Sequence, residues 1–458
     1  MAITMAFYSS STPFVCTRCL RRASTARSRF STAISPRARR NATFPAASYR
    51  YNAFKPTLKY CRPSSNATMS SRRAYFNQPG PPKSLPPAGI AELFHRRLIY
   101  LSGTDAPKFL QGLTTNNVNP KVITPWYSAF LDARGRIMWD SFIYPDPSQG
   151  SSGWACFIEV DGTEAGNLFK HLKRHKLRSK IEIRLVEEAE ASVWAGWQDN
   201  GATESEARAS EPPWPALDDS ASDPSSYTVA ICDPRAPGFG WRIVLPKSES
   251  SNLISSGEMN EFPIVDATSY HIRRYLYGIP EGPKEMPPAS ALPMESNIDL
   301  MHGIDFRKGC YVGQELTIRT KHTGVVRKRI LPVQLYHKTE ELSEALLLAG
   351  YDPNWSLQKT GEPVHNEHIP AGTDIKQLDE DGTVKKGRAT GKFLAGISNV
   401  GLALCRLEMM TDMKVSAEGG SWRPGMEFGM QWGEQDAEGR HKSVRIKPIV
   451  PQWLRDRE

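Results

Sequence analysis

The strongest constraint on this chain is that no acidic residue occurs before Glu92, although the first 91 residues contain 12 Arg and 3 Lys. This Ser-rich segment with scattered apolar residues has the composition of a mitochondrial transit peptide, and it lacks the single long apolar core of a secretory signal. The alternative is a disordered basic arm that binds anions. We predict a transit peptide over residues 1–75, a Pro-rich linker over residues 76–88 and a folded body that begins near Gly89.

The net charge of +9 divides into +15 for the first 91 residues and −6 for the rest. A folded domain that binds nucleic acid needs a basic face of its own, so the mildly acidic body argues against nucleic acid as a partner. No run of 18 apolar residues occurs, so the sequence predicts neither a membrane-spanning helix nor a membrane partner. The transit peptide predicts import into the mitochondrial matrix.

Local patterns predict alternating strands and helices in the folded body. Ala-Arg-Gly-Arg between two apolar, β-prone runs predicts a hairpin. Asp266 or Thr268 is expected to cap a helix that ends at Gly278. Strands are expected at residues 98–101, 127–132, 137–144, 155–160, 181–185, 192–197, 228–231 and 241–244, and helices at residues 106–113, 163–177 and 266–277.

The pattern changes near residue 330. Residues 89–329 contain an insertion, residues 198–226, which has 7 acids and 1 Arg and is predicted to be disordered. Residues 330–458 show short apolar runs broken by Gly and Pro, which predict a separate β-rich domain. Within that domain, residues 336–386 are expected to be an insertion with long loops and a helix over residues 340–348.

The run Phe-Arg-Lys-Gly-Cys-Tyr-Val-Gly-Gln-Glu, residues 306–315, is the most informative about chemistry. Gly309 and Gly313 permit tight turns around Cys310 and close approach of a ligand. Neighbouring cations favour a thiolate over a thiol. The candidate cations near Cys310 are Arg307, Lys308, Arg319 and His322. The alternative is a buried structural cysteine in a tight turn.

Other residues around this run have simpler interpretations. Gln314 and Glu315 are expected to begin a short helix, where a carboxylate suits the helix dipole. His302 and His322 are interpreted as hydrogen-bonding residues rather than metal ligands. The other cysteines of the body lie far from Cys310 in the sequence, which indicates reduced thiols rather than a disulfide framework.

The run Lys-Gly-Cys-Tyr-Val-Gly-Gln-Glu, preceded by Gly-Ile-Asp-Phe-Arg, resembles the signature of the YgfZ-like proteins, relatives of the aminomethyltransferase (T-protein) of the glycine cleavage system. Weaker similarity covers residues 97–118, 130–144, 273–282, 292–297 and 401–406. The resemblance implies an α+β fold, a ring of two α+β portions of folate-binding type closed by a C-terminal β-barrel. It also implies the following site residues: Lys308, Gly309, Cys310, Tyr311, Gly313, Gln314, Glu315 and Arg319.

Together with the leader, the resemblance implies an assembly factor that matures mitochondrial 4Fe–4S proteins with A-type iron–sulfur carriers and is not a turnover enzyme. Cys310 is then either one ligand of a transient, shared cluster or a redox-sensitive thiol. Because a cluster needs several closely spaced thiolates, we expect no stable cluster on the isolated chain. A redox thiol enzyme would need a resolving cysteine, and none lies near Cys310 in the sequence.

The competing interpretation is a tetrahydrofolate-dependent aminomethyltransferase. Enzymes of that family carry a Gly-Gly-Ile-x-Asp-Asp pattern in the first hairpin. Here Arg136 replaces the second glycine and Trp139 replaces one acid, which argues against aminomethyl transfer, while Asp140 remains. The resemblance leaves tetrahydrofolate binding open, through an aromatic shelf, a carboxylate and cations. The candidates are Tyr127, Arg134, Trp139, Asp140 and Arg319.

Overall fold

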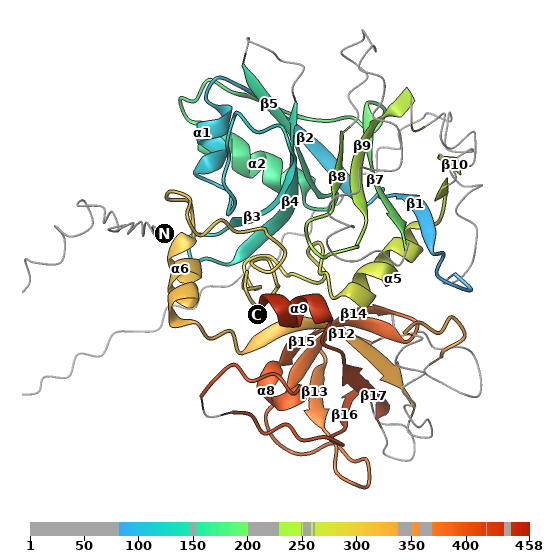
Figure 1. Cartoon of the computed structure of the whole chain (residues 1–458). Coiled ribbons are helices and arrows are strands. Elements are labelled where there is room, and N and C mark those ends of the chain that lie inside the picture. Colours follow the sequence, from blue (N-terminus) through green and yellow to red (C-terminus); the bar gives the residue numbers. More distant parts are fainter. Residues whose placement is uncertain are drawn as a thin grey trace, which may run out of the picture. The chain divides into compact units, whose positions relative to one another are not determined.

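The structure is a computed structural model, shown in Figure 1. It describes residues 82–146, 153–199, 229–248, 250, 258–259, 262–337, 350–356, 369–417, 419–434 and 441–458. The predicted transit peptide, the acidic insertion from residue 200 onward and the predicted helix over residues 340–348 lie outside the described residues.

The first α+β portion contains a five-stranded antiparallel sheet of order β3-β4-β5-β2-β6. The predicted hairpin is confirmed, and Gly135 lies in its turn with φ +79°. Helices α1 (Ala106–Gln111) and α2 (Ala165–Lys176) cover one face of the sheet. The strands are β2 (Arg96–Gly103), β3 (Trp126–Leu131), β4 (Ile137–Asp146), β5 (Trp154–Asp161) and β6 (Glu182–Leu185).

The second α+β portion contains a four-stranded antiparallel sheet of order β1-β7-β9-β8 and helix α5 (Ala267–Tyr277). The Asp266 side chain caps α5 by accepting from the Thr268 amide at 2.7 Å, and Gly278 ends it with φ +73°, as predicted. The strands are β1 (Ala88–Glu92), β7 (Ala191–Gln198), β8 (Val229–Cys232) and β9 (Trp241–Pro246), with a separate short pair β10 (Glu258–Met259) and β11 (Phe262–Pro263).

A closed six-stranded barrel follows, in the order β12-β15-β14-β13-β16-β17. The predicted barrel is therefore confirmed, but residues 336–386 are more than an insertion because they contribute one of its strands. Helix α6 (Gln314–Thr323) precedes the barrel, and α8 (Leu407–Met410) and α9 (Gln452–Arg457) belong to it in sequence. The strands are β12 (Lys328–Tyr336), β13 (Asp374–Gln377), β14 (Gly391–Ile397), β15 (Val400–Arg406), β16 (Phe428–Trp432) and β17 (Lys442–Pro448).

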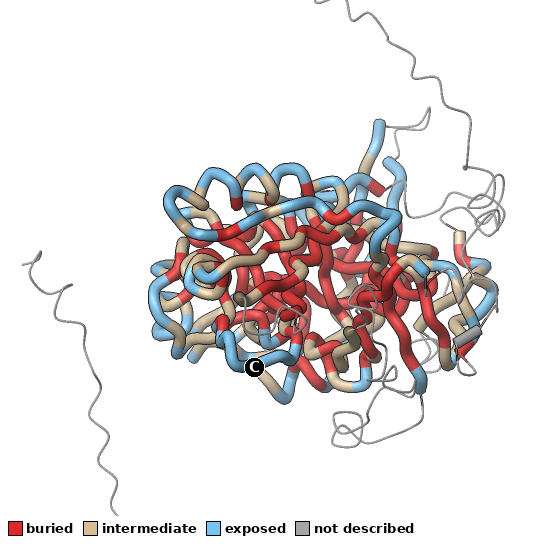
Figure 2. The backbone as a smooth tube through the Cα atoms, turned by 90° about the horizontal axis from the view of Figure 1, so that it is seen from above, coloured by how far each residue is buried: buried red, intermediate tan, exposed pale blue. Residues whose placement is uncertain are grey.

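The five-stranded sheet is buried on both faces, which explains why nearly every residue of β4 is buried. One face packs on α1 and α2, and the other joins a larger core that continues through α5 into the barrel. Figure 2 shows this buried interior in red beneath an exposed outer layer. The mixed α/β content and the barrel confirm the predicted fold class.

Candidate functional site

The signature loop, residues 306–313, lies between the segment that ends at Asp305 and the start of α6. Backbone hydrogen bonds hold both of its flanks. The amide of Asp305 donates to the carbonyl of Thr115, and the amide of Val312 donates to the carbonyl of Gly112, each at 3.1 Å. The chain segment that follows α1 is therefore the support on which the loop rests.

Between these anchors, Gly309 and Cys310 form an exposed tip. The other cysteines of the described residues differ from Cys310: Cys156 and Cys405 are buried and Cys232 is half-buried. Burial raises the pKa of the Cys156 and Cys405 thiols, which makes them unreactive. Cys310 is therefore an accessible thiol, and the alternative of a buried structural cysteine is wrong.

Lys308 anchors the loop from inside. Its Nζ donates to the carbonyls of Thr114 at 2.6 Å and Asn116 at 2.8 Å, and it lies 4.9 Å from the centre of the Tyr311 ring. Burial lowers the pKa of Lys308 to about 8. The sequence predicts that this ammonium stabilises a Cys310 thiolate. Its hydrogen bonds go instead to two backbone oxygens that lie beneath the loop.

The remaining predicted cations do not surround the thiol either. Arg307, Arg319 and His322 are exposed. Within the described residues, no hydrogen bond or ion pair joins any of them to Cys310. Arg319 and His322 lie on α6, beyond the loop, so closeness in sequence does not become contact in the fold.

The two glycines of the motif have different roles. Gly313 has φ +80°, and a Cβ there would lie 2.3 Å from the carbonyl oxygen of Asp132. A Cβ on Gly135, in the hairpin turn, would lie 2.8 Å from the carbonyl oxygen of Gly313. The loop and the hairpin thus meet backbone against backbone. A Cβ on Gly309 would meet no atom within 4 Å, so folding does not require glycine there.

Helix α6 begins where the sequence predicts. Gly313 is its N-cap, and the side-chain oxygen of Gln314 accepts from the Tyr311 amide at 3.3 Å. Glu315 is exposed in the first turn, where its carboxylate suits the helix dipole. The helix start therefore fixes the end of the signature loop.

The candidate folate residues do not gather in one place. Tyr127 and Asp140 face the larger core, where the pKa of Tyr127 is raised by burial first and by the charge of Asp140 second. Trp139 faces the opposite side of the sheet and donates to Glu164 at 2.9 Å. Arg134 is 71% exposed at the hairpin turn. A pterin held by all four residues does not fit this placement.

Asp140 is only partly bonded, because Oδ2 has an ion pair but accepts no hydrogen bond from the described residues. Its Oδ1 accepts from the Gly282 amide at 3.0 Å, and its Oδ2 lies 3.4 Å from Arg96. The Tyr127 hydroxyl is buried and has no hydrogen-bond partner within the described residues. Of the four folate candidates, Tyr127 and Asp140 each keep one buried oxygen without a hydrogen bond among the described residues, so tetrahydrofolate binding stays a prediction for these two.

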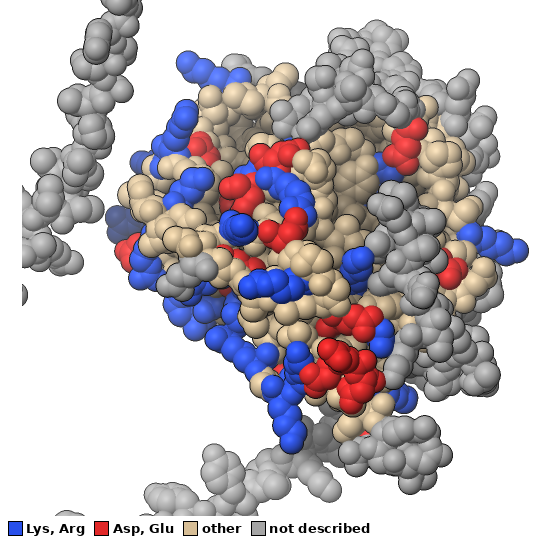
Figure 3. Space-filling model, turned by 60° about the horizontal axis from the view of Figure 1, so that its bottom comes forward, with Lys and Arg blue, Asp and Glu red and all other residues tan. Residues whose placement is uncertain are grey.

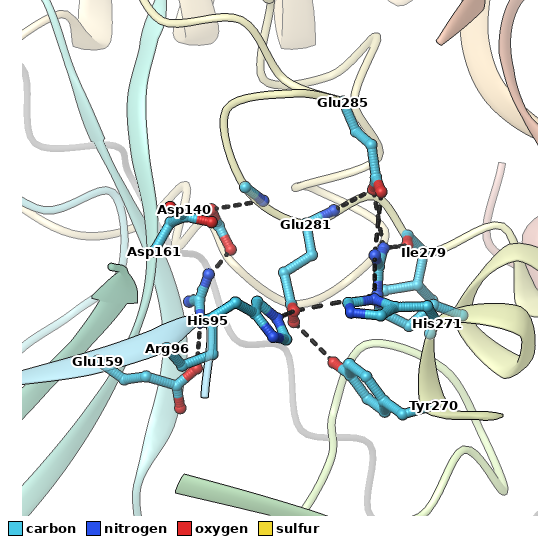
Figure 4. A network of polar contacts seen from close by, with 12 residues as sticks. His95, Arg96, Asp140, Glu159, Asp161, Tyr270, His271, Ile279, Glu281 and Glu285 are labelled. Atoms are coloured by element: carbon cyan, nitrogen blue, oxygen red, sulfur yellow. Dashed lines mark hydrogen bonds and ion pairs between the residues drawn. The ribbon is translucent and has the colours of Figure 1, made fainter. Parts of the chain in front are cut away.

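A buried ionic network lies beside Asp140, and Figure 4 shows part of it from close by. Its centre is Glu281, whose side chain is 1% exposed. Four groups bond this carboxylate: Arg235 at 2.8 Å, Arg242 at 2.9 Å, the Tyr270 hydroxyl at 2.7 Å and His95 at 3.1 Å. The network joins β2, β9 and α5, so it ties the two α+β portions together.

A second carboxylate, Glu159, extends the network. Arg96 and Arg242 each donate to Glu159 at 2.6 Å. Burial alone would raise the pKa of Glu159, but these two guanidinium groups lower it to about 2. No short spacing in the sequence reveals this network, because its members come from distant segments of the chain.

Two further observations bear on function. Within the described ranges, no three His, Cys, Asp or Glu side chains gather as metal ligands. In the same part of the chain, no helix has the length and apolar character to cross a membrane.

Comparisons with known proteins agree with this architecture. The family model "CAF17, C-terminal beta-barrel domain" matches residues 327–456, which cover the barrel. The fold is similar to the crystal structure of glycine cleavage system aminomethyltransferase T from Bartonella henselae, with a TM-score of 0.50 and 13% identity, over 81% of this chain and 87% of that one. At this identity the likeness concerns the fold alone.

Curated relatives are much more similar in sequence. The chain is 42% identical over 433 residues to the mitochondrial iron–sulfur cluster assembly factor IBA57 homologue of Aspergillus fumigatus, covering 89% of this chain and 88% of the relative. It is 44% identical over 378 residues to the homologue of Neurospora crassa, covering 81% and 82%. The chain therefore belongs to the family of mitochondrial iron–sulfur cluster assembly factor IBA57 homologues.

Proposed function

We propose that this protein is a non-catalytic factor of the mitochondrial matrix that helps A-type iron–sulfur carriers to mature 4Fe–4S proteins. The names of its relatives support the general role in mitochondrial iron–sulfur cluster assembly. The observation that carries the proposal to the level of residues is the exposed Cys310 at the tip of the signature loop.

The role of Cys310 follows from the number of thiolates that a cluster needs. Iron–sulfur clusters usually have four protein ligands. Of the cysteines in the described residues, only Cys310 is exposed. It supplies one ligand while the carrier supplies the others, so the cluster is shared and transient, and the isolated chain does not retain it.

A reconstitution tests this role. The full chain is mixed with an A-type carrier that holds an iron–sulfur cluster, and cluster absorbance and iron are measured in the isolated complex. The expected result is a shared cluster with the wild type and a loss of at least tenfold with Cys310→Ser. Cys232→Ser is the control, since Cys232 is half-buried on β8. Equal cluster content with Cys310→Ser and wild type would show that Cys310 is not a ligand.

Gly309→Val should separate folding from function at the loop tip. Because a Cβ at residue 309 meets no atom within 4 Å, the variant should change the free energy of unfolding by no more than about 0.5 kcal/mol. It should still lower the yield of the shared cluster several-fold, because the branched side chain keeps a partner away from Cys310. Gly166→Val on α2, where the surroundings are equally open, is the control. Full cluster yield with Gly309→Val would argue against close approach at the tip.

A further inference from the structure

A cavity of about 620 Å³ lies beside α6, the helix that follows the signature loop. We call it the arginine pocket. One face of α6 forms a wall of it, through side chains one and two turns apart: Leu316, Thr317, Thr320 and Thr323. The turn over residues 292–295 and the start of β12 complete the lining, together with two arginines of the barrel.

The lining combines an apolar wall with cations. Leu292, Pro293, Met294 and Val325 contribute apolar surface. The cationic side chains are Arg327, Lys328, Arg388 and Arg406. On the molecular face that Figure 3 displays, Lys and Arg side chains gather along the left edge, and a group of Asp and Glu side chains adjoins some of them lower down.

Positive charge in the pocket is poorly balanced. Glu295 is the one carboxylate among the described residues that line it, and its ion pair with Lys328 is 2.9 Å long. Arg327 and Arg388 are exposed, and within the described residues neither guanidinium group has a hydrogen bond or an ion pair. Burial and the nearby charge of Arg388 both lower the pKa of Arg406. Arg406 donates through Nε to the Ala389 carbonyl at 3.2 Å, and the charge of Arg327 helps to lower the pKa of the Glu408 carboxyl. The guanidinium of Arg388 and the terminal nitrogens of the other two arginines therefore remain for a ligand that brings negative charge.

The position of the pocket limits what that ligand is. Helix α6 starts next to the signature loop, and its ten residues, about 15 Å in length, run along the pocket from Leu316 in the first turn to Thr323 at the end. Five extended residues of another chain cover about 17 Å. A protein whose cluster reaches Cys310 can therefore place a neighbouring segment in the pocket.

We propose that the arginine pocket is the docking site for an acidic segment of the iron–sulfur carrier, with carboxylates on Arg327, Arg388 and Arg406 and an apolar side chain against the wall of the pocket. Arginine matches carboxylates in a bidentate geometry, which gives orientation as well as attraction. The inference rests on the proposed function, because it takes the carrier as the partner. It separates docking, in the pocket, from cluster binding, at Cys310.

The test compares the affinity of the full chain and its variants for a cluster-loaded A-type carrier by isothermal titration calorimetry. The double variant Arg327→Glu/Arg388→Glu should raise the Kd at least tenfold, since both side chains are exposed and their loss leaves the fold intact. The double variant Arg174→Glu/Arg178→Glu has the same charge change but lies at α2, and it should leave the Kd within twofold. Equal weakening by both pairs would overturn the pocket in favour of a general charge effect.

Cys310→Ser distinguishes this inference from the proposed function. It should abolish the shared cluster while the Kd for the carrier stays within about threefold of the wild type. If Arg327→Glu/Arg388→Glu binds the carrier normally but Cys310→Ser loses the cluster, the pocket is wrong and the proposed function stands. If the wild type does not bind the carrier at all, both fail.

Discussion

Replacing Glu281 with alanine should lower the free energy of unfolding by about 3–5 kcal/mol, which is the cost of breaking a buried ion pair from one side. The carboxylate is 1% exposed and bonds Arg235 and Arg242 at once. Without it, positive charge stays buried among Phe142 and Tyr270 with less to neutralise it. Urea unfolding followed by tryptophan fluorescence measures the change.

Glu190→Ala is the matched control. Glu190 also pairs with an arginine, Arg184 at 2.8 Å, but both side chains are roughly half exposed. Exposed pairs of this kind contribute between about 0 and 1 kcal/mol. If the two alanine variants unfold at the same urea concentration, the buried network does not stabilise the fold as described.

The same network predicts acid sensitivity. The folded-state pKa of Glu159 is lowered to about 2, and that of Glu281 is also lowered, so both carboxylates hold protons more weakly in the folded protein than in the unfolded chain. Their stabilising effect is complete above pH 4.5, the ordinary value, and is lost as the pH falls from there towards 2. Glu281→Ala should flatten the stability profile in this range.

Gly313→Ala should destabilise the fold by about 2–5 kcal/mol, since it combines an unfavourable backbone conformation with overpacking. Its φ of +80° is strained for any residue with a Cβ, and that Cβ would lie 2.3 Å from the Asp132 carbonyl oxygen. The loop would have to leave the hairpin turn at Gly135. Thermal unfolding and the reactivity of Cys310 with a thiol reagent should both report the displacement.

Gly309→Ala supplies the comparison in the same loop, because a Cβ there meets open space. It should unfold at the wild-type temperature. A Gly313→Ala protein that is as stable as Gly309→Ala would mean that the backbone contact between loop and hairpin adapts without cost.

Local patterns carried most of the fold that could be predicted from the sequence. The cap at Asp266, the stop at Gly278 and the hairpin around Gly135 depend on neighbouring residues, and all three are confirmed. Strand β13 was missed because it is four residues long and lies among polar residues. Its strand pairing comes from β14 and β16, which a local pattern does not contain.

The candidate site was predicted less well, for two physical reasons. Trp139 and Asp140 are adjacent in a strand, so their side chains point to opposite faces, and they could not share a ligand. Lys308 looked like a partner of Cys310, but its amine bonds carbonyls almost two hundred residues earlier in the chain. The motif itself located the exposed thiol because its residues are contiguous.

The open surroundings of the loop tip also bear on how natural selection acts on this protein. Gly313 and Lys308 are restrained by what folding requires, so mutations there are removed even if no partner exists. Gly309 and Cys310 face solvent and have no such restraint. Stability alone therefore permits other residues at both positions. If a glycine and a cysteine nevertheless occur at these two positions across species, the reason is that a partner protein requires them.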